Sequence, residues 1–248
     1  MADAAVLKDL APTGRLRAAI NLGNSVLAQK DDASDAPNGI KGITPELAHE
    51  LGKRLGVPVE LVPFDGAGKA FEALTAGDVD IAFLANEPAR AAEIEFTAPY
   101  VLIYGEYMVP KDSNLKTVAD VDQPGIRIAV GPNSAYDLFL TRKLKNATIV
   151  RADTGGGRAM IDLFVRDKLE VAAGVRQPLL AYAKDHPEVR LIDEPFMEIK
   201  QSMAARKGHF AGAAYLSTFI EKMKANGFVA DALKRSGPTA TVAPPATP

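Results

Sequence analysis

Short apolar runs alternate with amphipathic stretches along most of the chain. Residues 15–22 (RLRAAINL) form a first β-rich run, and further runs of this kind cover 57–64 and 79–85. Between them, apolar residues recur with helical spacing at Leu47, Ala48, Leu51 and Leu55, and a shorter helical stretch covers 70–76. Strands that alternate with helices in this way predict an α/β fold with largely parallel strands.

The second half repeats the alternation. We expect strands at 126–130, 147–151 and 169–174, with helices between them that bury their apolar stripes. A later stripe consists of Tyr215, Leu216, Phe219, Ile220 and Met223. The segment 31–41 reads as a polar loop. The Pro-rich end from Gly237 (GPTATVAPPATP) has no period, which predicts a disordered or loosely docked tail.

Several helix ends are marked by residues with a known preference for them. Thr44 is a good N-cap and Pro45 fits the first helical position, while Gly56 is suited to end the same helix. Ser134 can cap the helix that follows the strand at 126–130. Gly227 is expected to close the last strong amphipathic helix.

Two blocks of the chain resemble each other. Residues 58–90 and 147–178 both run strand, glycine-containing loop, helix, acidic turn and strand, and a shift of ninety places Asp80 on Glu170. Two generic βαβ units would explain this equally well, but the pattern also suggests two α/β lobes whose strand ends face one cleft. Ligands of open α/β sheets bind beyond the carboxyl ends of the strands.

Composition narrows the function classes. A length of 248 residues, with 47% apolar and 24% charged residues, suits one or two ordinary globular domains. A net charge of −2 gives no reason to expect a nucleic acid or an anionic membrane as partner. The absence of cysteine excludes disulfides and thiolate chemistry, and no apolar run reaches the length of a transmembrane helix. The start, MADAAVLKDLAPTG, lacks the pattern of a signal peptide, so we expect either a cytoplasmic protein or an export signal removed beforehand.

No pattern indicates an enzyme, a cofactor or a metal site. The glycines at 66–68 and 155–157 do not have the spacing of phosphate or dinucleotide loops and read as tight turns. Ser134 does not lie in a G-x-S-x-G elbow. The histidines, His49, His186 and His209, lack metal-ligand spacing and are expected to face solvent.

The order of several segments resembles the family 3 extracellular solute-binding proteins, the type II periplasmic binding proteins of polar amino-acid ABC transporters. The segments are RLRAAINLGN, GITPELAHELGKRLGVPVELV, AGDVDIAFLANEPARAAEIEFTAPY and VADVDQPGIRIAVGPNSAYDLFL, and the resemblance covers about residues 13–236. It implies a two-lobed α/β fold, each lobe a mostly parallel sheet flanked by helices, with the ligand cleft between the lobes. Lobe 1 would comprise 1–103 and 199–236, lobe 2 would comprise 104–198, and 237–248 would form the tail.

The resemblance also implies roles for particular residues. In the family the arginine after the third strand grips the ligand carboxylate, and Arg90 matches it. A guanidinium offers two parallel donors to a carboxylate, which contributes about 1.5–3 kcal/mol. In the second lobe, Ser134 with its neighbours Asn133 and Ala135 would meet the same carboxylate at a helix start, where unpaired N–H groups favour an anion. Helix capping alone is the simpler role for Ser134, and the two roles are compatible.

Departures from the family pattern bear on the ligand. Small hydroxyl residues often precede the arginine, but here those positions hold Ala85 and Glu87. The aspartate that usually pairs with the ligand ammonium is replaced by Val175, followed by Arg176. The acidic and aromatic positions of the first lobe correspond to Asn21 and Asn24.

An ordinary amino acid would thus find no obvious ammonium partner unless Glu87 or Asp65 supplied one, and an unpaired buried ammonium is costly. We therefore expect a small organic anion or an atypical amino acid. The resemblance implies a monomeric, periplasmic receptor for an ABC transporter that closes its lobes on the ligand. A cytoplasmic sensor or scavenger is one alternative. A dehydratase-like enzyme that uses Glu87 is another.

Overall fold

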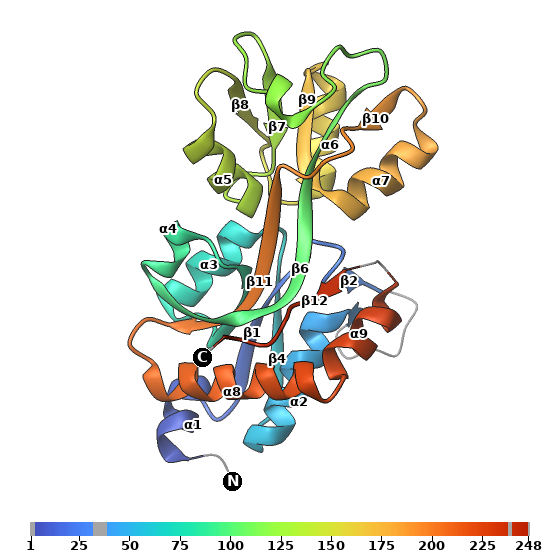
Figure 1. Ribbon diagram of the computed structural model, residues 1–248. Coiled ribbons are helices and arrows are strands. Elements are labelled where there is room, and N and C mark those ends of the chain that lie inside the picture. The colour runs from blue at the N-terminus through green and yellow to red at the C-terminus, as the bar shows by residue number, and fades with distance from the viewer. Residues whose placement is uncertain (1–2, 32–38, 238–239, 248) are drawn as a thin grey trace. The chain divides into compact units, whose positions relative to one another are not determined.

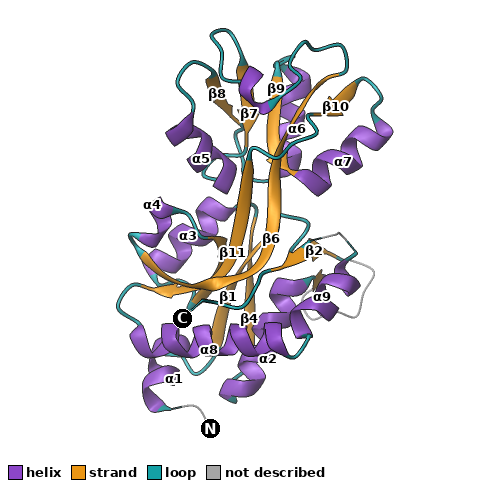
Figure 2. Ribbon diagram, in the orientation of Figure 1, coloured by secondary structure: helices purple, strands orange, loops and turns teal. Residues whose placement is uncertain are grey.

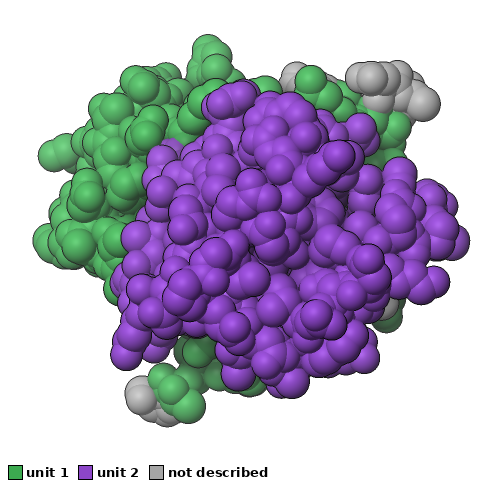
Figure 3. Space-filling model, turned by 90° about the horizontal axis from the view of Figure 1, so that it is seen from above, with its two compact units in different colours: residues 1–64, 69–102, 200–248 green, residues 65–68, 103–199 purple. Residues whose placement is uncertain are grey.

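The structure is a computed structural model that describes residues 3–31, 39–237 and 240–247 (Figure 1). The chain divides into two compact units, coloured separately in Figure 3. Unit 1 consists of residues 1–64, 69–102 and 200–248, and unit 2 consists of residues 65–68 and 103–199. Two long strands, β6 (Ile94–Pro110) and β11 (Met197–Arg206), each contribute residues to both units.

Unit 1 is built on a mainly parallel sheet. Its centre has the order β4–β1–β5, in which β1 pairs in parallel with both neighbours. β11 then pairs antiparallel with β5, and β6 follows β11. Besides β6 and β11, the strands of this unit are β1 (Leu16–Asn21), β2 (Gln29–Lys30), β3 (Ile40–Lys41), β4 (Val59–Phe64), β5 (Ile81–Ala85) and β12 (Thr241–Val242). β2 and β3 pair separately as a short antiparallel ribbon.

Helices flank this sheet (Figure 2), and the longer ones bury apolar side chains. They are α1 (Ala4–Leu10), α2 (Ile43–Leu55), α3 (Ala67–Ala76), α4 (Pro88–Ala91), α8 (Phe210–Ala225) and α9 (Phe228–Ser236). Leu47 and Leu51 of α2 are completely buried, as are Leu216 and Ile220 of α8. Each such side chain contributes about 1.5–3 kcal/mol through the removal of apolar surface from water.

Two of the predicted helix ends are placed differently by the structure. Gly42 is the N-cap of α2, and Thr44 lies inside the first turn, buried, with its hydroxyl 3.4 Å from the Leu27 carbonyl oxygen. Gly56 ends α2 in the left-handed conformation, as predicted. Gly227 also has this conformation, but α8 already ends at Ala225 and Gly227 caps the start of α9.

Both ends of the chain contain structure that the sequence did not predict. α1 is tied to α8, because the Asp9 carboxylate accepts a hydrogen bond of 2.9 Å from the Gly212 amide. Near the other end, β12 pairs antiparallel with Val101 and Leu102 of β6, so the prediction of a disordered or loosely docked tail is wrong for these residues. Lys224 supports the pairing by donating to the carbonyl oxygens of Pro99 and Pro244.

Unit 2 contains a smaller group of parallel strands. Its order is β8–β7–β9, with β6 antiparallel beside β9 and β10 antiparallel beside β6. The elements are β7 (Arg127–Val130), β8 (Thr148–Arg151), β9 (Val171–Val175), β10 (Val189–Leu191), α5 (Ala135–Lys143), α6 (Gly157–Arg166), α7 (Arg176–Asp185) and a 3₁₀ turn at Val118–Asp120. One core cluster joins the sheet to α6 and α7 through Met160, Phe164 and Leu179.

The two units repeat one strand–helix–strand arrangement. β4, α3 and β5 of unit 1 correspond in order to β8, α6 and β9 of unit 2. In unit 1, Arg17 at the beginning of β1 binds Asp80 through its backbone N–H and its guanidinium. Arg127 at the beginning of β7 makes the same set of bonds to Glu170. The likeness of 58–90 to 147–178 is therefore confirmed in the structure.

Candidate ligand-binding site

The predicted site residues of unit 1 gather at one edge of its sheet. β1 ends at Asn21 and β5 ends at Ala85, and these parallel strands are neighbours. The short helix α4 follows β5 after two residues and carries Arg90. This edge is where ligands of open α/β sheets bind.

Arg90 is buried, with 3% of its surface exposed. Its Nη1 donates a hydrogen bond of 3.2 Å to the carbonyl oxygen of Ala85, which holds the guanidinium against the end of β5. Burial lowers the pKa of Arg90 to about 10, while the charge of Glu87 acts in the opposite direction. Arg90 is thus a desolvated cation and not a surface arginine.

Glu87 and Ala85 lie on the same short segment. Glu87 is 5% exposed and occupies the N-cap position of α4, where its carbonyl oxygen accepts a hydrogen bond of 3.0 Å from the Arg90 amide. Pro88 follows at the first helical position, which suits its fixed φ. The segment therefore holds a buried carboxylate three residues before a buried guanidinium.

Asn21 and Asn24 serve local turns. The Asn21 side-chain oxygen accepts from the Gly23 amide at 2.9 Å, and that of Asn24 accepts from the Val26 amide at 3.2 Å. Asn24 is buried, whereas Asn21 is partly exposed. Their side-chain oxygens therefore have partners within the loop after β1.

Gln201 is a candidate that sequence reasoning missed. It lies on β11 directly opposite Ala85 and is 5% exposed. Within the described part of the chain, its buried Oε1 has no hydrogen-bond partner. A buried polar atom without a partner calls for an explanation, and a bound ligand would supply one. The only signal in the sequence is a glutamine in an otherwise strand-like run.

In unit 2, Ser134 caps α5 as predicted. Its hydroxyl oxygen accepts a hydrogen bond of 3.1 Å from the Asp137 amide. Asn133 has a φ of 55°, and its amide donates to the Asp137 carboxylate at 2.8 Å. Ala135, buried, is the first residue of the helix. The Ser134 hydroxyl also forms a side-chain hydrogen bond with Tyr136, so its capping role is accompanied by a second contact within α5.

The start of α5 is fixed by an ion pair between a buried carboxylate and an exposed arginine. Asp137 is 1% exposed and accepts from the Nε of Arg151 at 3.0 Å. Arg151 ends β8 and also donates through Nη2 to the Thr141 hydroxyl. These contacts join β8 to the first two turns of α5.

The end of β9 carries a second pair of this kind. Val175 is buried, and Arg176 after it begins α7. The Nη1 of Arg176 lies 3.2 Å from Oε1 of Glu106, a buried residue of β6 opposite Gly174. Burial raises the pKa of Glu106, while the charge of Arg176 partly opposes this. Sequence reasoning missed Glu106, which lies in a long strand with no local motif.

Asp65 comes directly after β4 and groups with unit 2. The candidates thus fall into two sets, one in each unit. Unit 1 holds Asn21, Asn24, Ala85, Glu87 and Arg90. Unit 2 holds Asn133, Ser134, Ala135, Val175 and Arg176.

The described residues contain no group of three or more His, Asp or Glu side chains arranged to hold a metal ion. The His186 side chain is 41% exposed, whereas His49 and His209 are partly buried, so the prediction that the histidines face solvent is wrong for these two. Hydrogen bonding explains one of them, because a ring nitrogen of His209 lies 3.0 Å from the Asp9 carbonyl oxygen. In the same part of the chain, we find no helix with the length and apolar character needed to span a bilayer.

Solved structures with the same fold define the class. AbpA, an amino-acid ABC transporter substrate-binding protein from Streptococcus pneumoniae bound to L-arginine, matches with a TM-score of 0.76 and 20% identity, covering 93% of this chain and 99% of AbpA. An ancestral amino-acid-binding protein, AncCDT-1, described as a precursor of cyclohexadienyl dehydratase, matches with a TM-score of 0.75 and 23% identity, covering 92% and 97%. The fold is that of the type II periplasmic binding proteins.

Sequence comparison gives the family. The profile of the bacterial extracellular solute-binding proteins, family 3, matches residues 30–237. The chain belongs to this family. A curated relative, the amino-acid-binding protein AabA of Dichelobacter nodosus, is 22% identical over 209 residues, which is 82% of this chain and 80% of AabA.

Proposed function

We propose that this protein captures a small carboxylate-bearing solute, an atypical amino acid or organic anion, by closing its two units on it. We further propose that it delivers this solute to an ABC transporter. The observation that carries the proposal is the buried Arg90 guanidinium at the carboxyl end of β5. Family membership supports the binding role.

Arg90 is suited to bind an anion. Its pKa of about 10 leaves it positively charged throughout the neutral range. In a desolvated position, each charge-assisted hydrogen bond to a carboxylate is stronger than it would be in water. The contact with the Ala85 carbonyl uses Nη1 and restrains the guanidinium before the ligand arrives. A restrained donor loses less entropy on binding.

Ser134 would supply the contribution of unit 2. It caps α5, and the first N–H groups of that helix lie at a helix start, which favours an anionic group. Closure would then follow from the ligand, since a ligand shifts such an equilibrium only by binding the closed state more tightly.

The proposed ligand class follows from Val175, which stands where the family usually has an aspartate that pairs with the ammonium group of the ligand. Val175 offers no acceptor, and the buried Glu106 near it is already paired with Arg176. An ordinary zwitterionic amino acid would leave its ammonium poorly satisfied in unit 2. The relatives described as amino-acid-binding make an amino-acid derivative the nearest alternative to a simple organic anion.

We propose a binding role without turnover, in a monomer that acts outside the cytoplasmic membrane. The family of extracellular solute-binding proteins supports this placement. A dehydratase activity would require Glu87 to act on the ligand. Absorbance assays with prephenate and arogenate would detect it, and we expect no turnover.

A thermal-shift screen tests the proposed ligand class. A ligand that binds only the folded protein raises the apparent stability of the protein by about 2.7 kcal/mol when the ligand concentration is about a hundred times Kd. The screen should pair each carboxylate with its amide, and we expect a shift with the acid and none with the amide. Binding of ordinary L-amino acids at micromolar affinity or better would contradict the proposal that the ligand is an atypical amino acid or organic anion. Amides that bind as tightly as their acids would contradict the proposal that the protein recognises a carboxylate.

A further inference from the structure

The charged groups at the ligand edge of unit 2 are arranged asymmetrically. At the end of β9, the Arg176 side chain is 47% exposed, whereas the carboxylate of its partner Glu106 is 3% exposed. The acceptor thus faces the protein interior and the donor group reaches solvent. A ligand that meets this position encounters a cation, which would repel an ammonium and attract an acidic group.

Arg151 provides an internal comparison. It ends the other outer parallel strand, β8, is equally exposed at 47%, and is also paired with a buried carboxylate, that of Asp137. However, its Nε and Nη2 are both bonded within unit 2, to Asp137 and Thr141. Arg151 therefore fixes the start of α5.

The Arg176 guanidinium has more donors left. In the part of the chain that the structure describes, its recorded polar contact is the ion pair from Nη1 to Glu106. A guanidinium has five N–H donors, so several stay available for a ligand. The contact with Glu106 also holds the group in one place, as the Ala85 carbonyl does for Arg90.

Arg176 and Ser134 follow the ends of two neighbouring strands. β7 lies between β8 and β9, and the loop after β7 leads into α5. Adjacent strands are about 4.8 Å apart, so the start of α5 and the start of α7 come from neighbouring strand ends. A ligand held at Ser134 can therefore extend a second group toward Arg176.

We propose that Arg176, positioned by Glu106, determines specificity by binding a second acidic group. This inference rests on the proposed function and narrows its ligand to a dianion, either a dicarboxylate or an amino-acid derivative with an acidic side chain. Glu106 acts through Arg176 as a positioning residue.

Calorimetry with matched ligand pairs tests this. The probes are the straight-chain dicarboxylates from malonate to adipate, each paired with its monoamide. We expect at least one acid to bind tenfold or more tightly than its amide. Arg176→Ala should reduce that ratio to about one while monoamide binding stays within threefold of the wild type.

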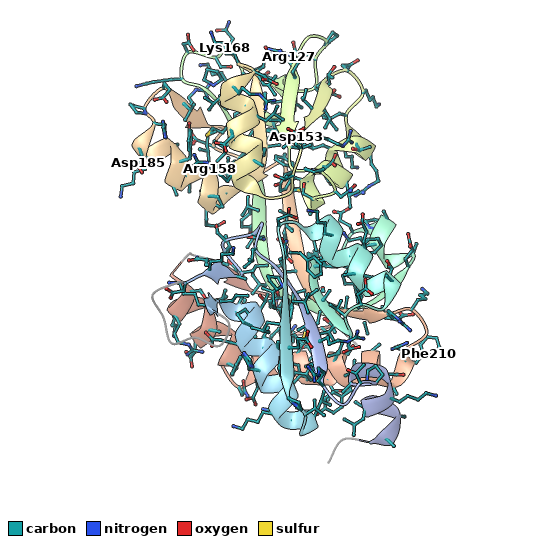
Figure 4. All side chains as sticks on the ribbon, turned by 180° about the vertical axis from the view of Figure 1, so that it is seen from behind. Arg127, Asp153, Arg158, Lys168, Asp185 and Phe210 are labelled. Carbon is teal, nitrogen blue, oxygen red and sulfur yellow. The ribbon has the colours of Figure 1, made fainter. Side chains whose placement is uncertain are left out.

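Arg158→Ala is the matched control. Arg158 lies on α6 in the same unit (Figure 4), its side chain is 84% exposed, and it pairs with Asp162 on its own helix. The control removes one positive charge from unit 2 and should leave the acid-to-amide ratio unchanged.

The outcomes separate this inference from the proposed function. A wild-type protein that binds the monoamides as tightly as the diacids would overturn the role of Arg176, although a carboxylate ligand would still stand. An acid-to-amide affinity ratio that stays unchanged in Arg176→Ala would also overturn the role of Arg176. A panel in which neither member of any pair binds counts against both proposals.

Discussion

Two buried polar side chains flank Ala85 at the end of β5 in unit 1. Arg90 donates to the carbonyl oxygen of Ala85, and Gln201 lies opposite Ala85 on the adjacent strand. Both are at least 95% buried. The Gln201 amide offers both a donor and an acceptor, so we propose that it contacts a ligand carboxylate held at Arg90.

Replacing Gln201 by Met should separate a binding role from a structural one. Because the Gln201 Oε1 has no partner among the described residues, an apolar side chain of similar volume should leave stability unchanged or raise it by about 1 kcal/mol. Ligand affinity should nevertheless fall at least threefold. Urea denaturation and calorimetry give the two quantities.

Ser202→Ala is the control for that experiment. The Ser202 hydroxyl is also buried without a partner in the described chain, but the next residue of a strand points to the opposite face. Its replacement should affect stability in the same way and leave affinity unchanged. Equal affinity in Gln201→Met and the wild type would exclude Gln201 from the site.

Sequence reasoning identified Arg90 and Ser134 because each follows a recognisable strand within a family segment. It missed Gln201 and Glu106 because both lie in the long strands β11 and β6, whose neighbours are distant in sequence. Gln201 pairs with Ala85 and Glu106 pairs with Gly174, and strand partners so far apart in the sequence leave no local signal. The structural surroundings of such residues become visible only when the strands are aligned.

At the level of elements, the same arginine clamp occurs in both units. Arg17 and Arg127 each bind an acidic residue at the start of the next parallel strand, and each also donates to a backbone carbonyl in the preceding turn. The clamp pins the amino end of a central strand. The opposite, carboxyl ends then carry the candidate binding residues.

The two clamps should contribute unequally to stability. The Asp80 side chain is 3% exposed, so Arg17→Ala leaves a buried carboxylate without its cation and should cost about 3 kcal/mol. Glu170 is 34% exposed and remains hydrated, so Arg127→Ala should cost clearly less. Denaturant titration of both variants checks this, and equal losses would contradict it.

Most strands and helices could be predicted from the apolar pattern, because buried parallel strands such as IAFLA leave a continuous apolar run. The first residue of α2 could not be predicted in this way. A Thr-Pro pair is typical of a helix start, but α2 begins earlier, with Gly42 as its N-cap, because tertiary packing outweighs the local preference. β12 was missed because its pairing with β6 depends on tertiary contacts that composition does not encode.

At the scale of the whole molecule, each unit carries a parallel sheet with its candidate residues at the carboxyl ends of the strands. Unit 1 contributes a buried cation and unit 2 contributes a helix start and a partly exposed cation. In each unit these groups suit an anionic ligand. The family has solute binding as its shared role.

The central claim is that Arg90 binds the carboxylate of the ligand. Isothermal titration of the wild type, Arg90→Ala and Arg90→Lys with the best carboxylate from the screen tests it most directly. Arg90→Ala leaves the buried Glu87 carboxylate without the nearby positive charge, which could destabilise the fold. The double variant Arg90→Ala/Glu87→Gln removes that unpaired charge as well, and circular dichroism checks that each variant is folded. We expect affinity to fall at least tenfold in both alanine variants, and by less in Arg90→Lys, which keeps the charge without the paired donors. Wild-type affinity in a folded Arg90→Ala protein would contradict the account.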